Sequence, residues 1–267
     1  MLLIFYYCMT TVHSILFPTN CKPADAKAFE YTLAVAKKLD AKVEVLHVCE
    51  LNLGVMVPGI VRYQLAQEQK KSATLVLDNW VQQFDFDGVA VQHQVELGFA
   101  KETIAIYANK RKDIELIAMG SRDNYGFSKI LKGTVISKTI DNVHCPVLVI
   151  PKGIVFQSIK NMAYVTPVVE DWRPSYPRLK NVAENFEAHL YVTHLAKGPE
   201  EEVEGAEHVV LEDYAGALHS FVYNANLHLL VTLASVRSTF RKILKYSKAQ
   251  KMAFETLIPL LVLKKRS

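Results

Sequence analysis

The chain has 267 residues, of which 50% are hydrophobic and 22% are charged, and its formal net charge is +4. This composition is that of an ordinary globular protein and argues against a disordered or fibrous chain. The net charge is too small to indicate nucleic-acid binding by itself. The length is enough for one large domain or for two domains of about 100–150 residues.

The sequence contains four cysteines, and none of them belongs to a CxxC pair. They are Cys8, Cys21, Cys49 and Cys145. Isolated cysteines of this kind are typical of reduced, mostly buried thiols in a cytoplasmic protein. They argue against disulfides and against a zinc site.

The N-terminus opens with a short apolar run over residues 2–8. A membrane-spanning helix needs about 20 apolar residues, and the run lacks the basic flank and the cleavage site of a signal peptide. We therefore expect no membrane segment here. Residues 1–10 are interpreted as an N-terminal extension before the first domain, and an additional edge strand over the apolar run is the alternative.

From residue 15 onwards, short apolar runs alternate with segments of helical periodicity. The predicted strands of the first half cover residues 15–17, 43–48, 89–97, 116–119 and 147–150. The predicted helices cover residues 26–39, 70–84, 102–110 and 135–143. The loop before residue 70 contains Gly54, Pro58 and Gly59, and we expect its apolar residues to pack down onto the domain. Strands that alternate with helices predict a parallel sheet with helices on both faces.

The stretch from residue 116 to residue 151 combines a strand, a glycine loop, a helix and a second strand. The first strand ends on Gly120, and after a polar loop Gly133 and Thr134 open the helix. Such a loop brings backbone N–H groups and a helix N-terminus to the carboxyl end of a strand. Phosphate groups bind at that place in open parallel sheets.

This stretch resembles the signature of the universal stress protein family. In that signature a glycine is followed by two residues, a second glycine, nine residues, and a final glycine with a hydroxyl residue. Gly120, Gly133 and Thr134 match it, whereas Asp123 stands in place of the second glycine. The resemblance implies a doubly wound, Rossmann-like α/β fold with a five-stranded parallel sheet of order 3-2-1-4-5. It also implies a nucleotide site where the strand order reverses.

The second half of the chain repeats the plan of the first. Residues 162–167 match residues 15–20, and residues 259–263 match residues 146–150, while the second-helix region has no counterpart. A repeat of domain length indicates duplication. We expect a first universal stress protein domain over residues 11–154 and a shortened, degenerate second one over residues 161–267. As in the family, the fifth strands of the two halves are expected to pair, here within one chain as a pseudo-dimer.

By resemblance, the nucleotide site of the first half is assigned to residues around the ends of strands one and four. They are Pro18, Thr19, Asn20, Val48, Met119, Gly120, Arg122, Asp123, Gly133 and Thr134. Family members that bind ATP hold the nucleoside with an aspartate at the position of Asn20. They place the residue at Val48 near the adenine and use backbone groups at the glycines for the phosphates.

Asp123 is the main departure from this pattern. A carboxylate about 4 Å from a phosphate repels it by roughly 1–4 kcal/mol. Arg122, Lys129 and Lys132 could offset this charge, or Mg²⁺ could bridge the carboxylate and the phosphates. Two interpretations stay open: a weak site for ATP or AMP, and a loop that is retained only for packing.

The second half has lost the corresponding site. Pro167 stands at the position of Asn20, Leu233 at that of Gly120, and Val236 at that of Asp123. Tyr246 and Ser247 replace the last glycine and threonine. A basic segment over residues 235–254 would suit an acidic partner or nucleic acid, but a solvated helical face is the favoured interpretation, because aromatic residues are not interleaved with its charges.

No catalytic motif was found in the sequence, and His47 and His194 are interpreted as packing residues. We therefore predict a non-enzymatic, cytoplasmic universal stress protein with a regulatory or protective role, which binds neither a membrane nor a specific nucleic acid. The alternative is a nucleotide-free scaffold that binds a protein partner. An ATP-hydrolysing enzyme is the least favoured interpretation, because no group is placed to activate water.

Overall fold

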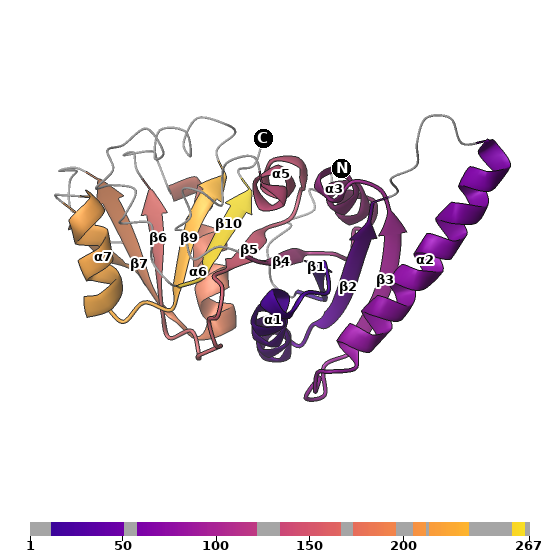
Figure 1. Ribbon diagram of the computed structural model, residues 1–267. Coiled ribbons are helices and arrows are strands. Elements are labelled where there is room, and N and C mark those ends of the chain that lie inside the picture. Colours follow the sequence, from indigo (N-terminus) through magenta and orange to yellow (C-terminus); the bar gives the residue numbers. More distant parts are fainter. Residues whose placement is uncertain are drawn as a thin grey trace, which may run out of the picture. The chain divides into compact units, whose positions relative to one another are not determined.

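The computed structural model describes residues 12–50, 58–121, 134–166, 173–195, 205–211, 214–234 and 258–264. These residues fall into two compact units. The N-terminal unit contains residues 13–121 and 134–156, and the C-terminal unit contains the residues from 157 onwards together with Val12. Each unit is a parallel sheet with helices packed against it (Figure 1).

The sheet of the N-terminal unit has the strand order β3-β2-β1-β4-β5, and every pairing in it is parallel. Its strands are β1 (Ser14–Thr19), β2 (Lys42–Cys49), β3 (Val91–Leu97), β4 (Leu116–Gly120) and β5 (Val147–Ile150). The order confirms the predicted 3-2-1-4-5 fold. The strand order reverses between β1 and β4, the two strands that meet at the centre of the sheet.

Helices cover both faces of this sheet. They are η1 (Pro23–Asp25), α1 (Ala26–Leu39), α2 (Gly59–Val81), α3 (Ala100–Lys110) and α5 (Val135–Asn142). The side chains of Phe29 in α1 and Trp80 in α2 contact each other with ring centroids 5.2 Å apart. The side chain of Asn109 in α3 donates to the carbonyl of Asn142 in α5 at 2.7 Å. Because parallel crossovers are right-handed, α1 and α2 lie on one face and α3 and α5 on the other.

An aromatic cluster forms the core between the sheet and the α1–α2 layer. It contains Phe17 from β1, Phe29, Trp80 and Phe84, with ring centroids from 4.7 to 6.4 Å apart. Phe17 and Phe29 are fully buried. Aromatic rings at these separations stabilise a core beyond their buried area, so the cluster anchors the C-terminal end of α2 to the sheet.

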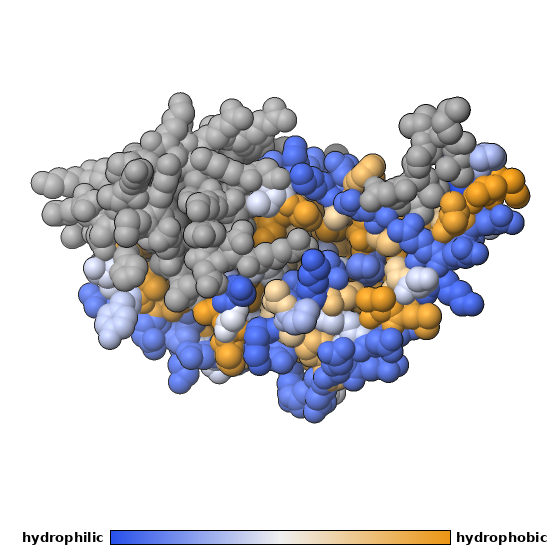
Figure 2. Space-filling view, viewed as in Figure 1, coloured by the Kyte–Doolittle hydropathy of each residue, from blue (hydrophilic) through white to orange (hydrophobic). Residues whose placement is uncertain are grey.

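Helix α2 begins at Gly59, eleven residues before the predicted start at residue 70. Its buried residues start only at Ala73, and the side chains of Ile60 and Val61 are 69% and 39% exposed. Figure 2 shows apolar surface among polar residues along this part of α2, at the right of the view. The expectation that the apolar residues of this region pack down is therefore wrong for Ile60 and Val61, while residues 51–57 lie outside the described residues.

The C-terminal unit contains a second sheet of the same design. Its strands are β6 (Asn161–Thr166), β7 (His189–Leu195), β8 (Glu207–Leu211), β9 (Leu229–Ala234) and β10 (Leu260–Lys264). They lie in the order β8-β7-β6-β9-β10, and all pairings are parallel. Its helices are η2 (Arg173–Ser175), α6 (Tyr176–Phe186) and α7 (Tyr214–Asn224). The tandem arrangement of two sheets of order 3-2-1-4-5 is thus confirmed.

The duplication extends to single backbone hydrogen bonds. Ala41 N donates to Ala36 O, and the repeat mate Ala188 N donates to Ala183 O, at 2.9 and 2.8 Å. At the other alignment, Ile117 N donates to Pro146 O, and Leu230 N donates to Pro259 O, at 3.0 and 2.9 Å. The two halves therefore repeat in register both before and after the deletion that the sequence predicts.

Several predictions concern residues that the structure does not describe. The N-terminal extension over residues 1–10 and the basic segment over residues 235–254 lie outside the described residues. The domain limits 11–154 and 161–267 and the pairing of the fifth strands stay predictions. Within the described part of the chain, no helix is both long enough and apolar enough to cross a membrane.

Candidate functional site

The carboxyl ends of β1 and β4 form the expected location of a ligand site in the N-terminal unit. The two strands are direct neighbours, with Ile15 paired to Leu116. β1 ends at Thr19 and β4 at Gly120. In an open doubly wound sheet, the ligand crevice lies outside the strand ends where the order reverses. The structure thus brings together two groups of predicted site residues, those at the end of β1 and those at the end of β4.

The loop after β1 is held by a carboxylate that the sequence analysis overlooked. Asp25 is 7% exposed, and its Oδ2 accepts hydrogen bonds from Thr19 Oγ1 at 2.8 Å and from Asn20 N at 3.1 Å. Thr19 Oγ1 in turn accepts from Cys21 N at 2.9 Å. Asp25 occupies the N-cap position of α1, but its side chain makes no capping bond to the helix. It turns back instead and fixes the conformation of residues 19–21.

Asn20 uses part of its side chain within the same loop. Its Oδ1 accepts from Lys22 N at 3.2 Å, which closes a turn of the Asx type. Among the described residues, the Nδ2 group of Asn20 has no hydrogen-bond partner. The donor of this amide is therefore the part of the side chain that is available for a ligand.

Cys21 lies in the left-handed region of backbone conformation, with φ of 60°. Few residues other than glycine adopt this conformation readily. Burial raises the pKa of its thiol to about 12, and the neighbouring carboxylate of Asp25 adds to the increase. A thiol is a nucleophile only as the thiolate, so Cys21 stays protonated near neutral pH and is poorly suited to covalent chemistry. Of the other described cysteines, Cys49 is partly exposed and Cys145 is buried.

His47 on β2 contacts the same loop from the neighbouring strand. Its Nδ1 lies 2.9 Å from Thr19 O, and a carbonyl oxygen can only accept. Nδ1 therefore carries the proton in this contact, which leaves a lone pair on Nε2 of the neutral ring. The histidine supports the loop, in agreement with its interpretation as a packing residue. Val48, the predicted adenine neighbour, follows it in β2 and is partly exposed.

Gly120 at the end of β4 lies against α1. A Cβ atom at this position would come within 2.8 Å of Ala28 Cβ and 3.9 Å of Asp25 Oδ1. Real Cβ atoms do not approach other heavy atoms this closely, so glycine is required here for the packing of α1 onto the strand end. Gly120 thus has a structural role regardless of any phosphate. The adjacent Met119 is buried.

Thr134 opens α5 as its N-cap residue. Its Oγ1 accepts from Ser137 N at 3.1 Å, and Ser137 Oγ donates to Thr134 O at 3.0 Å. The cap orders the N-terminus of α5, where the helix dipole and free N–H groups favour an anion. Of the remaining predicted site residues, Arg122, Asp123 and Gly133 lie outside the described residues.

Comparison with known proteins supports the assignment of the fold. Residues 11–151 match the model of the universal stress protein family. The chain belongs to the universal stress protein family. It is 29% identical over 146 residues to the universal stress protein MJ0531 of Methanocaldococcus jannaschii, covering 52% of this chain and 81% of that protein. It is 34% identical over 84 residues to the universal stress protein Sll1388 of Synechocystis, covering 32% of this chain and 54% of that protein.

Solved structures extend the likeness to both units. A universal stress protein from Archaeoglobus fulgidus superimposes with a TM-score of 0.70 at 19% identity, covering 96% of this chain and 97% of that chain. The structure described as a putative universal stress protein from Pseudomonas aeruginosa gives a TM-score of 0.59 at 14% identity, covering 96% of this chain and 94% of that one. At these identities the likeness concerns the fold alone. The likeness of fold therefore covers the residues of both units.

The residue that sequence reasoning missed, Asp25, carried a recognisable signal. It directly precedes the predicted helix 26–39, and aspartate is a preferred residue at a helix N-cap. That rule would have drawn attention to it, but would have assigned it to the helix rather than to Thr19 and Asn20. In the described part of the chain, no group of three or more His, Cys, Asp or Glu side chains could hold a metal ion.

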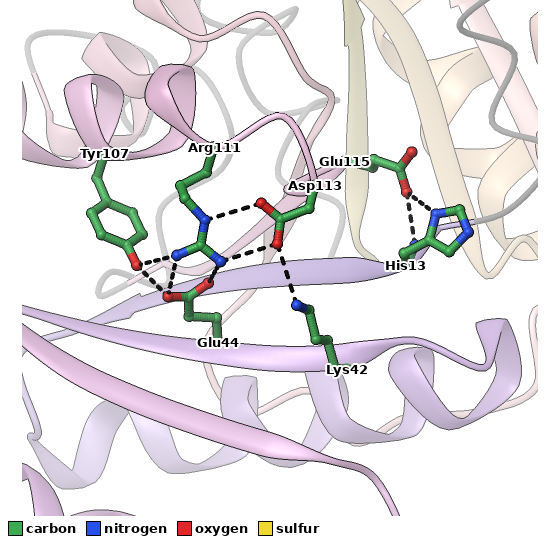
Figure 3. A network of polar contacts seen from close by, with 7 residues as sticks. All are labelled: His13, Lys42, Glu44, Tyr107, Arg111, Asp113 and Glu115. Atoms are coloured by element: carbon green, nitrogen blue, oxygen red, sulfur yellow. Dashed lines mark hydrogen bonds and ion pairs between the residues drawn. The ribbon is translucent and has the colours of Figure 1, made fainter.

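A second polar cluster lies at the opposite, amino-terminal end of the strands (Figure 3). Glu44 on β2 is 4% exposed and accepts hydrogen bonds from Tyr107 Oη and from Arg111 Nη1, the latter at 3.2 Å. Arg111 also pairs with Asp113, and Lys42 Nζ lies 3.2 Å from Asp113 Oδ2. Burial and the carboxylate of Glu44 raise the pKa of Tyr107. The cluster connects α3 and the turn before β4 to β2, at the end of the strands opposite to the candidate site.

Proposed function

We propose that the N-terminal unit carries a nucleotide site of ATP or AMP type at the carboxyl ends of β1 and β4. On this proposal, the protein is a cytoplasmic universal stress protein with a regulatory or protective role. The observation that carries the proposal is the reversal of strand order between β1 and β4. Ligands of doubly wound sheets bind outside the strand ends at such a point.

Local features support the two ends of the ligand. The loop after β1 offers the donor of Asn20 beside the buried carboxylate of Asp25, which suits the nucleoside. The capped N-terminus of α5 at Thr134 suits the phosphates, because the N–H groups of a helix N-terminus attract anions. In this proposal Gly133 and Arg122 would complete the phosphate end, and Asp123 is the residue that could hold a Mg²⁺ ion, which would offset the charge of the phosphates.

The proposed activity is binding without turnover. Cys21 is kept protonated by burial, and His47 and Asp25 are engaged in holding the loop. General-base catalysis needs a group within hydrogen-bond reach of the attacking water. On this proposal the groups at the end of β1 lie at the nucleoside end of the ligand, away from the phosphates, which favours a protein that senses a nucleotide over one that hydrolyses it.

A nucleotide-free scaffold that binds a protein partner is the second candidate. Gly120 supports it, because the packing of α1 against β4 explains this glycine without any phosphate. Thr134 supports it as well, because its hydroxyl already accepts from the backbone of α5. Both residues of the signature would then be retained for the fold.

Direct measurement of nucleotide separates the two candidates. The freshly purified protein would be denatured and the released small molecules identified by mass spectrometry, and ATP and AMP would be titrated into the protein by calorimetry with and without Mg²⁺. We expect a saturable heat for at least one nucleotide. The absence of both released nucleotide and binding heat would exclude the nucleotide site and leave the scaffold as the better description.

We also propose that the fifth strands β5 and β10 pair within one chain. Both strands are short and apolar, and their side chains are almost fully buried. The unpaired backbone groups at the edge of such a strand tend to pair with another strand. Hydrogen exchange tests the pairing against the edge strands β3 and β8. Slow exchange at every amide of Val147–Ile150 and Leu260–Lys264 is expected, whereas exchange as fast as in β3 and β8 would argue against it.

A further inference from the structure

The carboxylate of Asp25 lies at the point where the strand order reverses. A Cβ atom at Gly120 would be 3.9 Å from Asp25 Oδ1, so this oxygen faces the end of β4. The opposite oxygen, Oδ2, faces the end of β1 and accepts from Thr19 Oγ1 and Asn20 N. The side chain therefore spans the gap between the two strand ends while remaining 7% exposed.

The two oxygens of this carboxylate differ in their hydrogen bonding. Oδ2 receives two donors, whereas Oδ1 receives none from the described residues. A largely buried carboxylate is stabilised by donors to both of its oxygens, and an oxygen without a donor is a strong acceptor. Oδ1 is thus ready to accept a hydrogen bond from a ligand.

Neighbouring groups complete a pattern of open donors and acceptors around Thr19. The Nδ2 group of Asn20 is a donor without a partner among the described residues, and it lies in the same loop that Asp25 holds through Oδ2. A ligand that matches this set carries hydroxyl groups, which both donate and accept. A phosphate only accepts and is negatively charged, so Asp25 would repel it from this end of the site.

We propose that Asp25 Oδ1 accepts a hydrogen bond from a ribose hydroxyl, and that the site consequently selects ribonucleosides and their phosphates over deoxyribose analogues. This inference rests on the nucleotide site proposed above and names its sugar specificity. Asp25 is then the specificity-determining residue, with the sugar at the β1 end and the phosphates directed toward α5.

Calorimetric titration with four ligands tests the specificity. The ligands are adenosine, AMP, 2′-deoxy-AMP and 3′-deoxy-AMP. A hydrogen bond to a charged acceptor is typically lost with about a 10- to 100-fold decrease in affinity. We therefore expect one of the two deoxy analogues to bind about 10- to 100-fold more weakly than AMP. Equal affinities of AMP and both analogues in the unaltered protein would overturn the inference and leave the nucleotide site standing.

Variants of Asp25 and Thr19 distinguish recognition of the ribose by Asp25 from its support of the loop after β1. Asp25→Asn should reduce the preference for ribose to near unity, because the amide replaces the charged acceptor. Thr19→Val removes a donor to Oδ2 but keeps the carboxylate, so it should weaken all four ligands while their ratio stays. Asp87→Asn, at an exposed carboxylate paired with Lys37, should change neither affinity nor ratio. A ribose preference that survives in Asp25→Asn would refute the role of Asp25.

The outcomes distinguish this inference from the function on which it rests. Binding of nucleotides without sugar preference contradicts only the inference. Binding of adenosine without AMP or ATP contradicts the phosphate part of the proposed function. Failure of every ligand to bind excludes both. Circular dichroism of each variant verifies that the fold is retained, and the ratio measured on the unaltered protein decides the matter even if Asp25→Asn does not fold.

Discussion

The two units have sheets of the same strand order, but they differ in the loops and residues at the carboxyl ends of the strands. Their first long helices end alike, with Asp40 and Glu187 in the left-handed conformation at φ of 52° and 54°. Their entries differ: residues 20–22 link β1 to η1, whereas the longer stretch 167–172 links β6 to η2. The N-cap residue of the first long helix is Asp25 in the N-terminal unit and Ser175 in the C-terminal unit, and Leu233 on β9 stands at the repeat position of Gly120. The structure shows the buried carboxylate of Asp25 and the close contact of Gly120 with α1 in the N-terminal unit, whereas residues 167–172 of the C-terminal unit lie outside the described residues.

The amino-terminal ends of the strands differ as well. Glu44 and Asp113 form a charged cluster with Arg111 in the N-terminal unit. At the repeat position of Glu44, the C-terminal unit has Tyr191, whose ring contacts Phe221 with centroids 5.3 Å apart. The same position in the second strand thus holds a charged side chain in one unit and an aromatic side chain in the other, and the strands pair in the same order in both. Sheet order is the same in the two units, and the chemistry of each end is set by a few residues at or near the strand ends.

Removal of Trp80 should have the largest effect and should act on one unit only. The aromatic cluster depends on α2, which has no counterpart among the described residues of the C-terminal unit. Trp80→Ala is expected to cost about 3–5 kcal/mol of unfolding free energy in the N-terminal unit. Calorimetry should then show an early transition for that unit. Tyr223→Ala, at a residue 83% exposed in the C-terminal unit, should leave the profile unchanged. An unaltered profile in Trp80→Ala would contradict the central role of the cluster.

A methyl group at Gly120 should test the close contact between the end of β4 and α1 in the N-terminal unit. Gly120→Ala places a Cβ 2.8 Å from Ala28 Cβ, and such overpacking costs about 1–3 kcal/mol. Ala28→Gly removes the opposing atom, so the double variant should recover part of the loss. A double-mutant cycle by urea unfolding measures this coupling. Additive losses would mean that the two residues do not clash.

Restoration of the family glycine should sharpen the difference in nucleotide binding. If only the carboxylate opposes the phosphates, Asp123→Gly should increase ATP affinity by roughly 5- to 150-fold, which corresponds to about 1–3 kcal/mol. Val236→Gly, the matching change in the C-terminal unit, should have no effect, because Leu233 and Tyr246 remain. Calorimetry with ATP and Mg²⁺ measures both variants. No gain from Asp123→Gly would favour a purely structural loop.

The charged cluster should make the N-terminal unit slightly more sensitive to acid. Hydrogen bonding to Arg111, reinforced by Lys42, holds the pKa of Asp113 well below its usual range. The resulting stabilisation is present above the unfolded pKa of about 4 and is lost as the pH falls toward the lower pKa of the folded state. Because Asp113 is 42% exposed, solvent screening limits the effect to less than about 1 kcal/mol.

Unfolding by urea at pH 7 and below pH 4 measures this contribution. Asp113→Asn should lose stability at pH 7 and show a smaller further loss in acid than the unaltered protein. The transition of the C-terminal unit serves as an internal reference, because Asn226 stands at the repeat position and does not titrate. Equal acid sensitivity of the protein with and without the Asp113 carboxyl would show that the pair contributes nothing.

Much of the fold follows from the sequence, and the exceptions have physical causes. Helix α1 was predicted with its observed bounds, because its buried residues recur at helical spacing along its whole length. The start of α2 was missed because its first turns bury no side chain and so show no apolar period. Strand order came from the family resemblance, since alternation of strands and helices alone does not fix it.

The candidate site was predictable only in part. The positions of Thr19, Asn20 and Gly120 followed from the repeat and the signature. The contact of Asp25 with Thr19 and Asn20 depends on the chain turning back at Cys21 with a positive φ. A cysteine in the sequence does not predict a positive φ. Side-chain bonds of this kind arise from the path of a loop, and local sequence patterns do not specify that path.

The central place of β1 has a consequence for the growing polypeptide. β1 is made first, yet it pairs on one side with β2 and on the other with β4, whose residues 116–120 emerge much later. Until then one edge of a buried apolar strand has no partner, and unpaired edges invite association between chains. Pairing of strands distant in sequence is also slow. Synthesis of the N-terminal unit therefore includes an interval, ending only when β4 leaves the ribosome, in which one edge of its central strand is unpaired.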